Sequence, residues 1–120
     1  MRLFRPVGDN ELELIARSDW RRFPPRLPEQ PIFYPVLNFD YAEQIARDWN
    51  SISGPGWVGH VLEFDVSDVM GLRYPVQTAG AAALHRELWV PAEELEMFNE
   101  AIEGLIRLVA TYRRGERVES

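Results

Sequence analysis

The chain has 120 residues, of which thirteen are arginine and none is lysine or cysteine. These absences exclude a disulfide framework, a thiolate nucleophile, a lysine Schiff base and the lysine of a phosphate-binding loop. A formal net charge of −6 also argues against general affinity for the phosphates of nucleic acid.

The composition is typical of one folded domain spanning residues 1–120. Hydrophobic residues make up 46% of the chain, enough for an ordinary apolar core. No apolar run approaches the ~20 residues of a membrane span, and the N-terminus lacks the apolar core of a signal peptide. We therefore expect a cytoplasmic protein with no membrane partner and no nucleic-acid partner.

The N-terminal residues predict a strand followed by a short helix. Arg2–Val7 has the composition of a strand that ends at a proline and a glycine. Asn10 and Glu13 are spaced as a capping box, which predicts that a helix begins there.

A loop rich in proline and arginine is predicted over Asp19–Pro31. Its four prolines restrict the backbone, and its arginines offer guanidinium groups, among them Arg26. Such a loop suits the wall of a site for an anionic ligand, with Arg26 as a candidate contact. The other interpretation is a stiff connector whose arginines are solvated.

Residues 31–50 predict a strand that leads into a helix. The run Ile32–Tyr34 is β-branched and aromatic, and Asp40 with Glu43 forms a second capping box. The helix then carries apolar residues at helical spacing: Ala42, Ile45, Ala46 and Trp49. Tyr34 thus stands where a strand joins a packed helix. It is either a ligand contact or a core residue whose hydroxyl is satisfied.

The second half of the chain predicts further strands. Residues 57–66 form a long strand with a buried, hydrogen-bonded His60, and residues 72–77 form another, interrupted by Pro75 and so placed at a sheet edge. The small-residue segment 78–84 leads into a short strand over 85–90 that carries Glu87 near its start.

The C-terminal part predicts one helix and a closing strand. Pro91 suits the first position of a helix, and its inner face would carry apolar residues as far as Ile102. Gly104 would end that helix, and residues 105–112 would form the last strand. The order of elements predicts an α+β fold with a curved or split, mainly antiparallel sheet and about three helices.

Motifs for several chemistries are missing from the sequence. The two histidines have no HExxH spacing, so no metal site is predicted. There is also no GxSxG motif for acyl transfer and no GxGxxG motif for dinucleotide phosphates. Glu63 and Glu87 leave open a carboxylate pair for glycoside hydrolysis. The remaining candidates are Arg5, Tyr34 and Glu87, which fall on or beside successive predicted strands.

These candidates lie within motifs that resemble a known family. The pattern LFRPVG…FPPR…PIFYPVLN…YAEQIARDW…HRELWVPAEELEMFN resembles small bacterial proteins labelled ADP-ribosylation/crystallin J1 over nearly the whole chain. In outline it is also similar to the catalytic domain of ADP-ribosyltransferases, especially the diphtheria-toxin-like group. Those enzymes carry a His or Arg on the first strand, a Tyr or Ser at a second motif and a Glu at the start of a later strand.

The resemblance implies a role for each matching residue. Arg5 would hold the ribose or phosphates of NAD, and Tyr34, with Tyr41 following it, would form the tyrosine motif that stacks on nicotinamide. Glu87 would stabilise the positive charge that develops on the ribose as nicotinamide leaves. His85 stands where some transferases place a residue that activates the target.

The expected function is therefore that of a small mono-ADP-ribosyltransferase that cleaves NAD and modifies an unknown protein target. The first motif has Arg where tyrosine-type members carry His, and no Ser-Thr-Ser motif is present. These departures fit the alternative, a non-catalytic module of the same fold that engages a partner protein, for example in a toxin–immunity or phage-defence locus. On that view Arg5 is a salt-bridged strand residue and Glu87 a surface acid.

Overall fold

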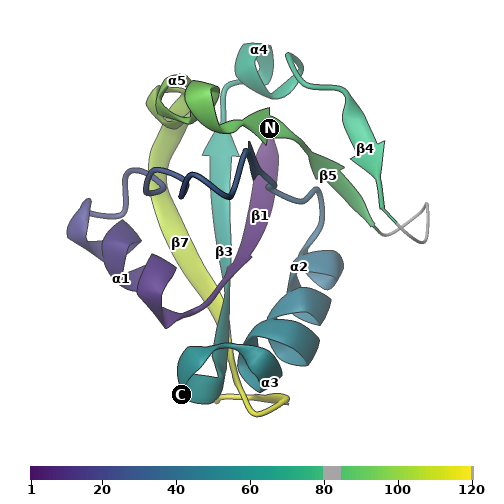
Figure 1. The fold of residues 1–120 in the computed structure, drawn as a ribbon. Helices are drawn as coiled ribbons and strands as arrows, with labels where there is room; N and C mark the ends of the chain where they lie inside the picture. The colour runs from purple at the N-terminus through teal and green to yellow at the C-terminus, as the bar shows by residue number, and fades with distance from the viewer. Residues whose placement is uncertain (80–84, 120) are drawn as a thin grey trace.

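A computed structural model of the chain describes residues 1–79 and 85–119, without the side chain of Pro55. Most of the small-residue segment predicted over 78–84 therefore lies outside the described part. The centre of the fold is an antiparallel sheet of four strands in the order β1-β3-β7-β8 (Figure 1). Its strands are β1 (Arg2–Val7), β3 (Val58–Val66), β7 (Ile102–Arg113) and β8 (Glu116–Arg117).

Two short strand pairs extend this sheet beyond β1. They are β4 (Val76–Thr78) with β5 (Arg86–Leu88), and β2 (Ile32–Phe33) with β6 (Val90–Pro91). Val36 joins β5 to β1, since it forms isolated antiparallel bridges with both Phe4 and Glu87. The Phe4 amide donates to the Val36 carbonyl over 2.9 Å, and the Val36 amide donates back over 2.8 Å. The sheet thus curls through this joint from β7 to β4.

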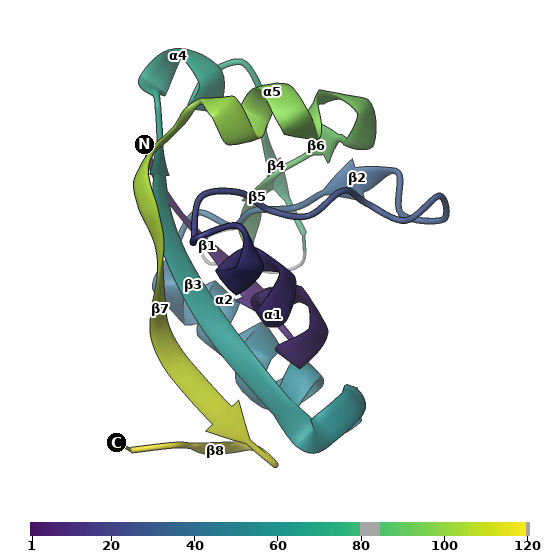
Figure 2. The ribbon, with the colours of Figure 1, turned by 90° about the vertical axis from the view of Figure 1, so that its left-hand side faces the viewer.

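The helices are short and lie around the sheet (Figure 2). They are α1 (Asp9–Arg17), α2 (Phe39–Ile45), the π-helical turn η1 (Ala46–Asn50), α3 (Ser51–Ser53), η2 (Pro55–Trp57), α4 (Asp68–Gly71), η3 (Ala92–Glu94) and α5 (Leu95–Glu100). None of the helices in residues 1–79 and 85–119 is long and apolar enough to cross a membrane.

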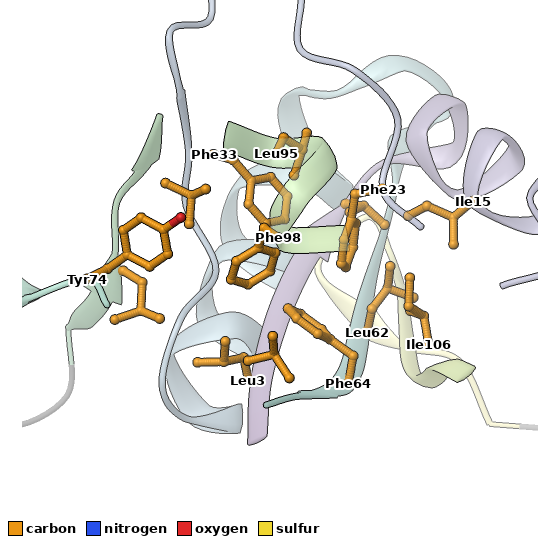
Figure 3. Close-up of a cluster of buried hydrophobic side chains, with 14 residues drawn as sticks. Leu3, Ile15, Phe23, Phe33, Leu62, Phe64, Tyr74, Leu95, Phe98 and Ile106 are labelled. Atoms are coloured by element: carbon orange, nitrogen blue, oxygen red, sulfur yellow. The ribbon is translucent and has the colours of Figure 1, made fainter. Parts of the chain in front are cut away.

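The core divides into two clusters because neighbouring strand residues point to opposite faces of the sheet. Leu62 belongs to the larger cluster, in which Phe23 packs against Phe33 and Phe64 with ring centroids 4.9 and 4.8 Å apart (Figure 3). Val61 belongs to the smaller cluster, which contains residues of α2, η1 and β7. The sheet is therefore covered on both faces.

Several predictions about the fold are confirmed. The structure is α+β with a curled antiparallel sheet. It has about four helices and not three, when α2, η1 and α3 are counted as one continuous helix and η3 with α5 as another. The first strand has the predicted bounds, and the closing strand is present over Ile102–Arg113. Ile102 therefore belongs to a strand and not to the preceding helix. His60 is buried as predicted, with Nε2 2.7 Å from Asp9 Oδ1 and Nδ1 2.9 Å from Thr111 Oγ1.

Both predicted capping boxes are wrong. Asn38 caps α2, because its Oδ1 accepts from the backbone amide of Tyr41 over 2.8 Å. Asp40 lies inside the first turn, and Glu43 instead accepts a hydrogen bond from the hydroxyl of Tyr112 on β7. The capping box at Asn10 and Glu13 is likewise absent, since α1 begins after Gly8 with no side-chain cap. In both cases the helix begins before the predicted cap.

Strand ends also differ from the predictions. The strand predicted over Ile32–Tyr34 stops at Phe33, which leaves Tyr34 outside regular structure and exposed. The strand predicted over residues 72–77 begins only at Val76, after Pro75. Proline cannot donate to a strand ladder, so pairing starts beyond it.

The predicted apolar stripe of the second helix fails at its last position, because the helix changes pitch. Ala42 and Ala46 are buried, but Trp49 is 67% exposed and the next buried residue is Ser51. In a π-helical turn, residues five apart succeed one another on a face, so Ser51 follows Ala46. The Ser51 hydroxyl then donates to the Arg47 carbonyl and accepts from the amide of Gly115.

Candidate functional site

A cleft of about 490 Å³ lies beside the joint between β1 and β5. Its volume is within the range of small-molecule sites, about 300–1,000 Å³. Four of the predicted site residues line it: Arg5, Arg26, Tyr34 and Glu87. Its other lining residues are Pro6, Val36, Ile45, Asn50 and Trp89. The joint at Val36 brings these elements together, since Phe4, Val36 and Glu87 lie in register across it.

Glu87 is a buried carboxylate held in one orientation. It lies in the middle of β5 and is 9% exposed. Trp89 Nε1 donates to its Oε1 over 2.8 Å, and the Tyr41 hydroxyl donates to its Oε2 over 3.0 Å. Each carboxylate oxygen can accept a further hydrogen bond. Glu87 is thus not a surface acid, and it keeps acceptor capacity for a ligand in the cleft.

Tyr41 acts on the cleft through Glu87 and does not itself line it. Burial, followed by the hydrogen bond to Glu87, raises the pKa of Tyr41 to about 12. The phenol therefore remains a donor at neutral pH. The predicted stacking of Tyr41 on a ligand stays a prediction, while the structure gives this residue a contact that orients the carboxylate.

The titration of the tyrosines provides a test of these contacts. Tyr41, Tyr74 and Tyr112 each donate to a carboxylate, and each has its pKa raised to about 12. The folded state then holds protons that the unfolded state loses near pH 10, so stability is expected to be full below pH 10 and to fall between pH 10 and 12. Absorbance at 295 nm should show Tyr41 ionising near pH 12, as the difference between wild type and Tyr41→Phe.

A normal titration near pH 10 in that difference curve would contradict the buried Tyr41–Glu87 contact. Tyr74→Phe supplies the matched control, because Tyr74 makes the same kind of bond, to Glu94, away from the cleft.

His85 stacks on the outer side of Tyr41. The two ring centroids are 4.6 Å apart with an angle of 25° between the planes, and His85 Nε2 lies 3.0 Å from Gln44 Oε1. His85 does not line the cleft. Its predicted role in activating a target stays a prediction, and its contact with the cleft runs through Tyr41.

Arg5 lines the cleft, is buried and is already paired. Its Nε and Nη2 donate to the two carboxylate oxygens of Glu11 over 2.6 and 2.9 Å, and its guanidinium lies 4.6 Å from the centre of the Phe33 ring. Arg5 is therefore a salt-bridged strand residue, and its predicted contact with a ligand stays a prediction. The Nη1 group makes neither bond, so the residue can also donate to a ligand.

Arg26 is the cation of the cleft that forms no salt bridge among the described residues, and its Nε is buried without a hydrogen-bond acceptor. Burial lowers the pKa of Arg26 from its ordinary value, and the positive charge of Arg5 lowers it further, although the negative charge of Glu11 acts to raise it. A bound anion would relieve both costs.

Two aromatic side chains form the outer edge of the cleft. Tyr34 and Trp89 are 41% and 44% exposed, and their rings meet edge to face with centroids 6.3 Å apart. Tyr34 is therefore not the satisfied core residue of the second interpretation. Half-exposed rings at a cleft mouth offer flat surfaces on which a planar ligand can stack.

Sequence reasoning missed several residues of this site, among them Glu11, Ile45 and Asn50. Glu11 pairs with Arg5, and no sequence motif distinguishes it from the other polar residues of the first helix. Ile45 and Asn50 reach the cleft together because η1 sets residues five apart on one face. No local signal in the sequence indicates this π-helical turn.

Comparisons with protein-family models, curated proteins and solved structures find no match to this chain. Within residues 1–79 and 85–119, no group of three histidine, aspartate or glutamate side chains is placed to hold a metal ion. Glu63 lies away from the cleft, where its Oε1 accepts from Arg107 Nε over 2.9 Å. The cleft itself therefore offers one carboxylate, two guanidinium groups and two aromatic rings.

Proposed function

We propose that the protein binds NAD or a closely related dinucleotide in this cleft and cleaves the bond between nicotinamide and ribose, as a small mono-ADP-ribosyltransferase. One observation carries the proposal. Arg5, Arg26, Tyr34 and Glu87 are separated by up to 82 positions in the chain and were selected on chemistry and resemblance, and they line a single cleft.

The charges and rings of the cleft suit the parts of a dinucleotide. Arg26 has an unpaired guanidinium that can donate to a phosphate, and Arg5 can add a donor from Nη1. Tyr34, with Trp89 at its edge, can stack on the nicotinamide ring. The ribose next to that ring would then lie near Glu87, whose carboxylate is the one acid of the cleft lining.

The reaction asks mainly for electrostatic stabilisation. The bond between ribose C1′ and the nicotinamide nitrogen breaks, its electron pair goes to that nitrogen, and C1′ gains positive charge. Glu87, fixed by Trp89 and Tyr41, presents negative charge to this centre without reorganising. A nucleophilic oxygen or nitrogen of the target, or water, then forms the new bond to C1′ and loses a proton.

The contribution of Arg26 can be measured by binding alone. Replacing Arg26 with Met keeps most of the apolar stem and removes the donors, and a charge-assisted hydrogen bond contributes about 1.5–3 kcal/mol. We therefore expect NAD affinity by titration calorimetry to fall about 10- to 100-fold. Arg22→Met is the matched control, because Arg22 is an exposed arginine of the same loop that does not line the cleft. Equal affinity in both variants would contradict the role of Arg26.

A second groove supports the alternative function as a binding module. It has a volume of about 730 Å³ and lies between the proline- and arginine-rich loop and α5, with Arg21 and Arg22 on one wall and Glu93 and Glu96 on the other. Such a surface offers both charges to a partner protein. If millimolar NAD gives no heat with the wild-type protein, while a protein encoded by a neighbouring gene forms a stable complex with it, the alternative is favoured.

A further inference from the structure

Two buried polar atoms of the cleft have no hydrogen-bond partner among the residues that the structure describes. They are Arg26 Nε, which is a donor, and Asn50 Oδ1, which is an acceptor. Both residues line the cleft. Buried polar atoms are nearly always satisfied in folded proteins, so an unsatisfied pair in one cleft marks where water or a bound ligand supplies the missing partners. Arg26 calls for an anion, as proposed above, whereas Asn50 calls for an N–H or O–H donor.

The backbone places Asn50 in the cleft and holds it there. Asn50 is the last residue of η1, and the π-helical turn sets it on the same face as Ile45. Its carbonyl accepts from the amide of Gly54 over 3.1 Å, and Gly59 of β3 lets the turn pack against the strand. The side chain therefore projects from a packed element, as a side chain that determines binding specificity requires.

The surroundings of Asn50 favour one part of a dinucleotide. The apolar side chains Ile45 and Val36 line the same cleft, and such surfaces suit an aromatic ring. The ribose hydroxyls, in contrast, would find their acceptor at Glu87. Two aromatic groups of NAD carry N–H donors, the nicotinamide carboxamide and the 6-amino group of adenine. With the nicotinamide ribose at Glu87, the donor that shares the cleft with Asn50 is the carboxamide.

We propose that Asn50 is a specificity-determining residue, whose Oδ1 accepts from the nicotinamide carboxamide and so selects NAD over the analogue that carries nicotinic acid. This inference rests on the proposed binding of NAD. At neutral pH the nicotinic acid group is a carboxylate, which accepts hydrogen bonds but donates none. Bound in the same place, it would set an anionic oxygen against Asn50 Oδ1.

Two substitutions separate the acceptor from the shape of the side chain. Asn50→Leu keeps the branched shape and the number of heavy atoms without polar groups, and Asn50→Asp keeps an acceptor that cannot rotate to become a donor. Titration calorimetry with NAD and with nicotinic acid adenine dinucleotide measures both ligands on the wild type and each variant, after thermal unfolding has shown that the variants fold.

We expect wild type to bind NAD about tenfold or more tightly than the nicotinic acid analogue, since the analogue leaves a buried acceptor unpaired. Asn50→Leu should lose about tenfold in NAD affinity and most of the preference, whereas Asn50→Asp should keep both. If wild type binds NAD but Asn50→Leu keeps its affinity and preference, the role of Asn50 is wrong and the proposed function stands. If wild type binds neither dinucleotide, the proposed function fails and this inference fails with it.

Discussion

Replacing Glu87 with Gln is expected to lower the cleavage of NAD about 10²- to 10³-fold, the usual effect of removing one preorganised electrostatic group from an active site. NAD affinity should change little, because the carboxylate acts mainly on charge that develops in the transition state. The measurement is release of nicotinamide at saturating NAD, together with titration calorimetry for affinity.

The substitution is expected to leave the fold intact. A glutamine in this position can accept from Trp89 Nε1 through its oxygen and donate to the Tyr41 hydroxyl through its nitrogen, so both present contacts find a partner. Glu94→Gln is the matched control, since Glu94 accepts from the Tyr74 hydroxyl over 2.9 Å in the same way but lies outside the cleft.

A Glu87→Gln protein that still cleaves NAD at the wild-type rate would remove Glu87 from the mechanism. A wild-type protein that binds NAD and does not cleave it would instead favour the non-catalytic alternative. In that case the hydrogen bond from Tyr41 to Glu87 serves only to hold β5 against α2, and the bond from Trp89 only to fix the chain after β5.

The strands of the central sheet could be predicted because their signals are local. Arg2–Val7 ends at proline and glycine, and its buried residues alternate as a strand requires. The closing strand could also be predicted from apolar residues at every second position, although its burial does not alternate regularly, since Leu108 is exposed beside the register shift with β3. The helix starts were predicted less well, because Asn38 and Asp40 both suit an N-cap and only the backbone decides that Asn38 is the cap.

The cleft was only partly predictable, because it depends on pairing between distant segments. Glu87 and Tyr34 could be selected as polar residues beside strand ends, but the register that aligns Phe4, Val36 and Glu87 is not written in any short motif. The ion pair between Arg5 and Glu11 depends likewise on how α1 returns over β1. Sequence reasoning thus named four residues of the cleft without the geometry that unites them.

Asn50 could not have been selected from the sequence. Helical spacing predicts that Trp49 continues the buried stripe, whereas the π-helical turn exposes Trp49 and aims Asn50 at the cleft. The π-helical turn is also where the helix comes closest to the sheet: Ala46 and Asn50 both lie against Gly59 of β3. Tertiary packing has overridden the local helical pattern.

Gly59→Ala is therefore expected to be strongly destabilising. A Cβ atom at this position would overlap the carbonyl oxygen of Ala46 and lie 2.8 Å from Asn50 Cβ, so η1 would have to move away from β3. The backbone carbonyl cannot rotate aside as a side chain does, and overpacking of this kind costs about 3 kcal/mol. Urea denaturation followed by circular dichroism should show this loss of unfolding free energy.

Gly8→Ala is the matched control, because a Cβ there meets no atom within 4 Å. Gly8 precedes α1 as its N-cap, where alanine is less favourable than glycine by less than about 1 kcal/mol. The gap between the two variants separates a close approach of backbones from a general effect of replacing glycine. Folded Gly59→Ala protein should also bind NAD more weakly than wild type, since η1 carries Asn50 into the cleft. Equal stability of the two variants would mean that β3 and η1 are not in close contact, and the argument for the position of Asn50 would fall with that contact.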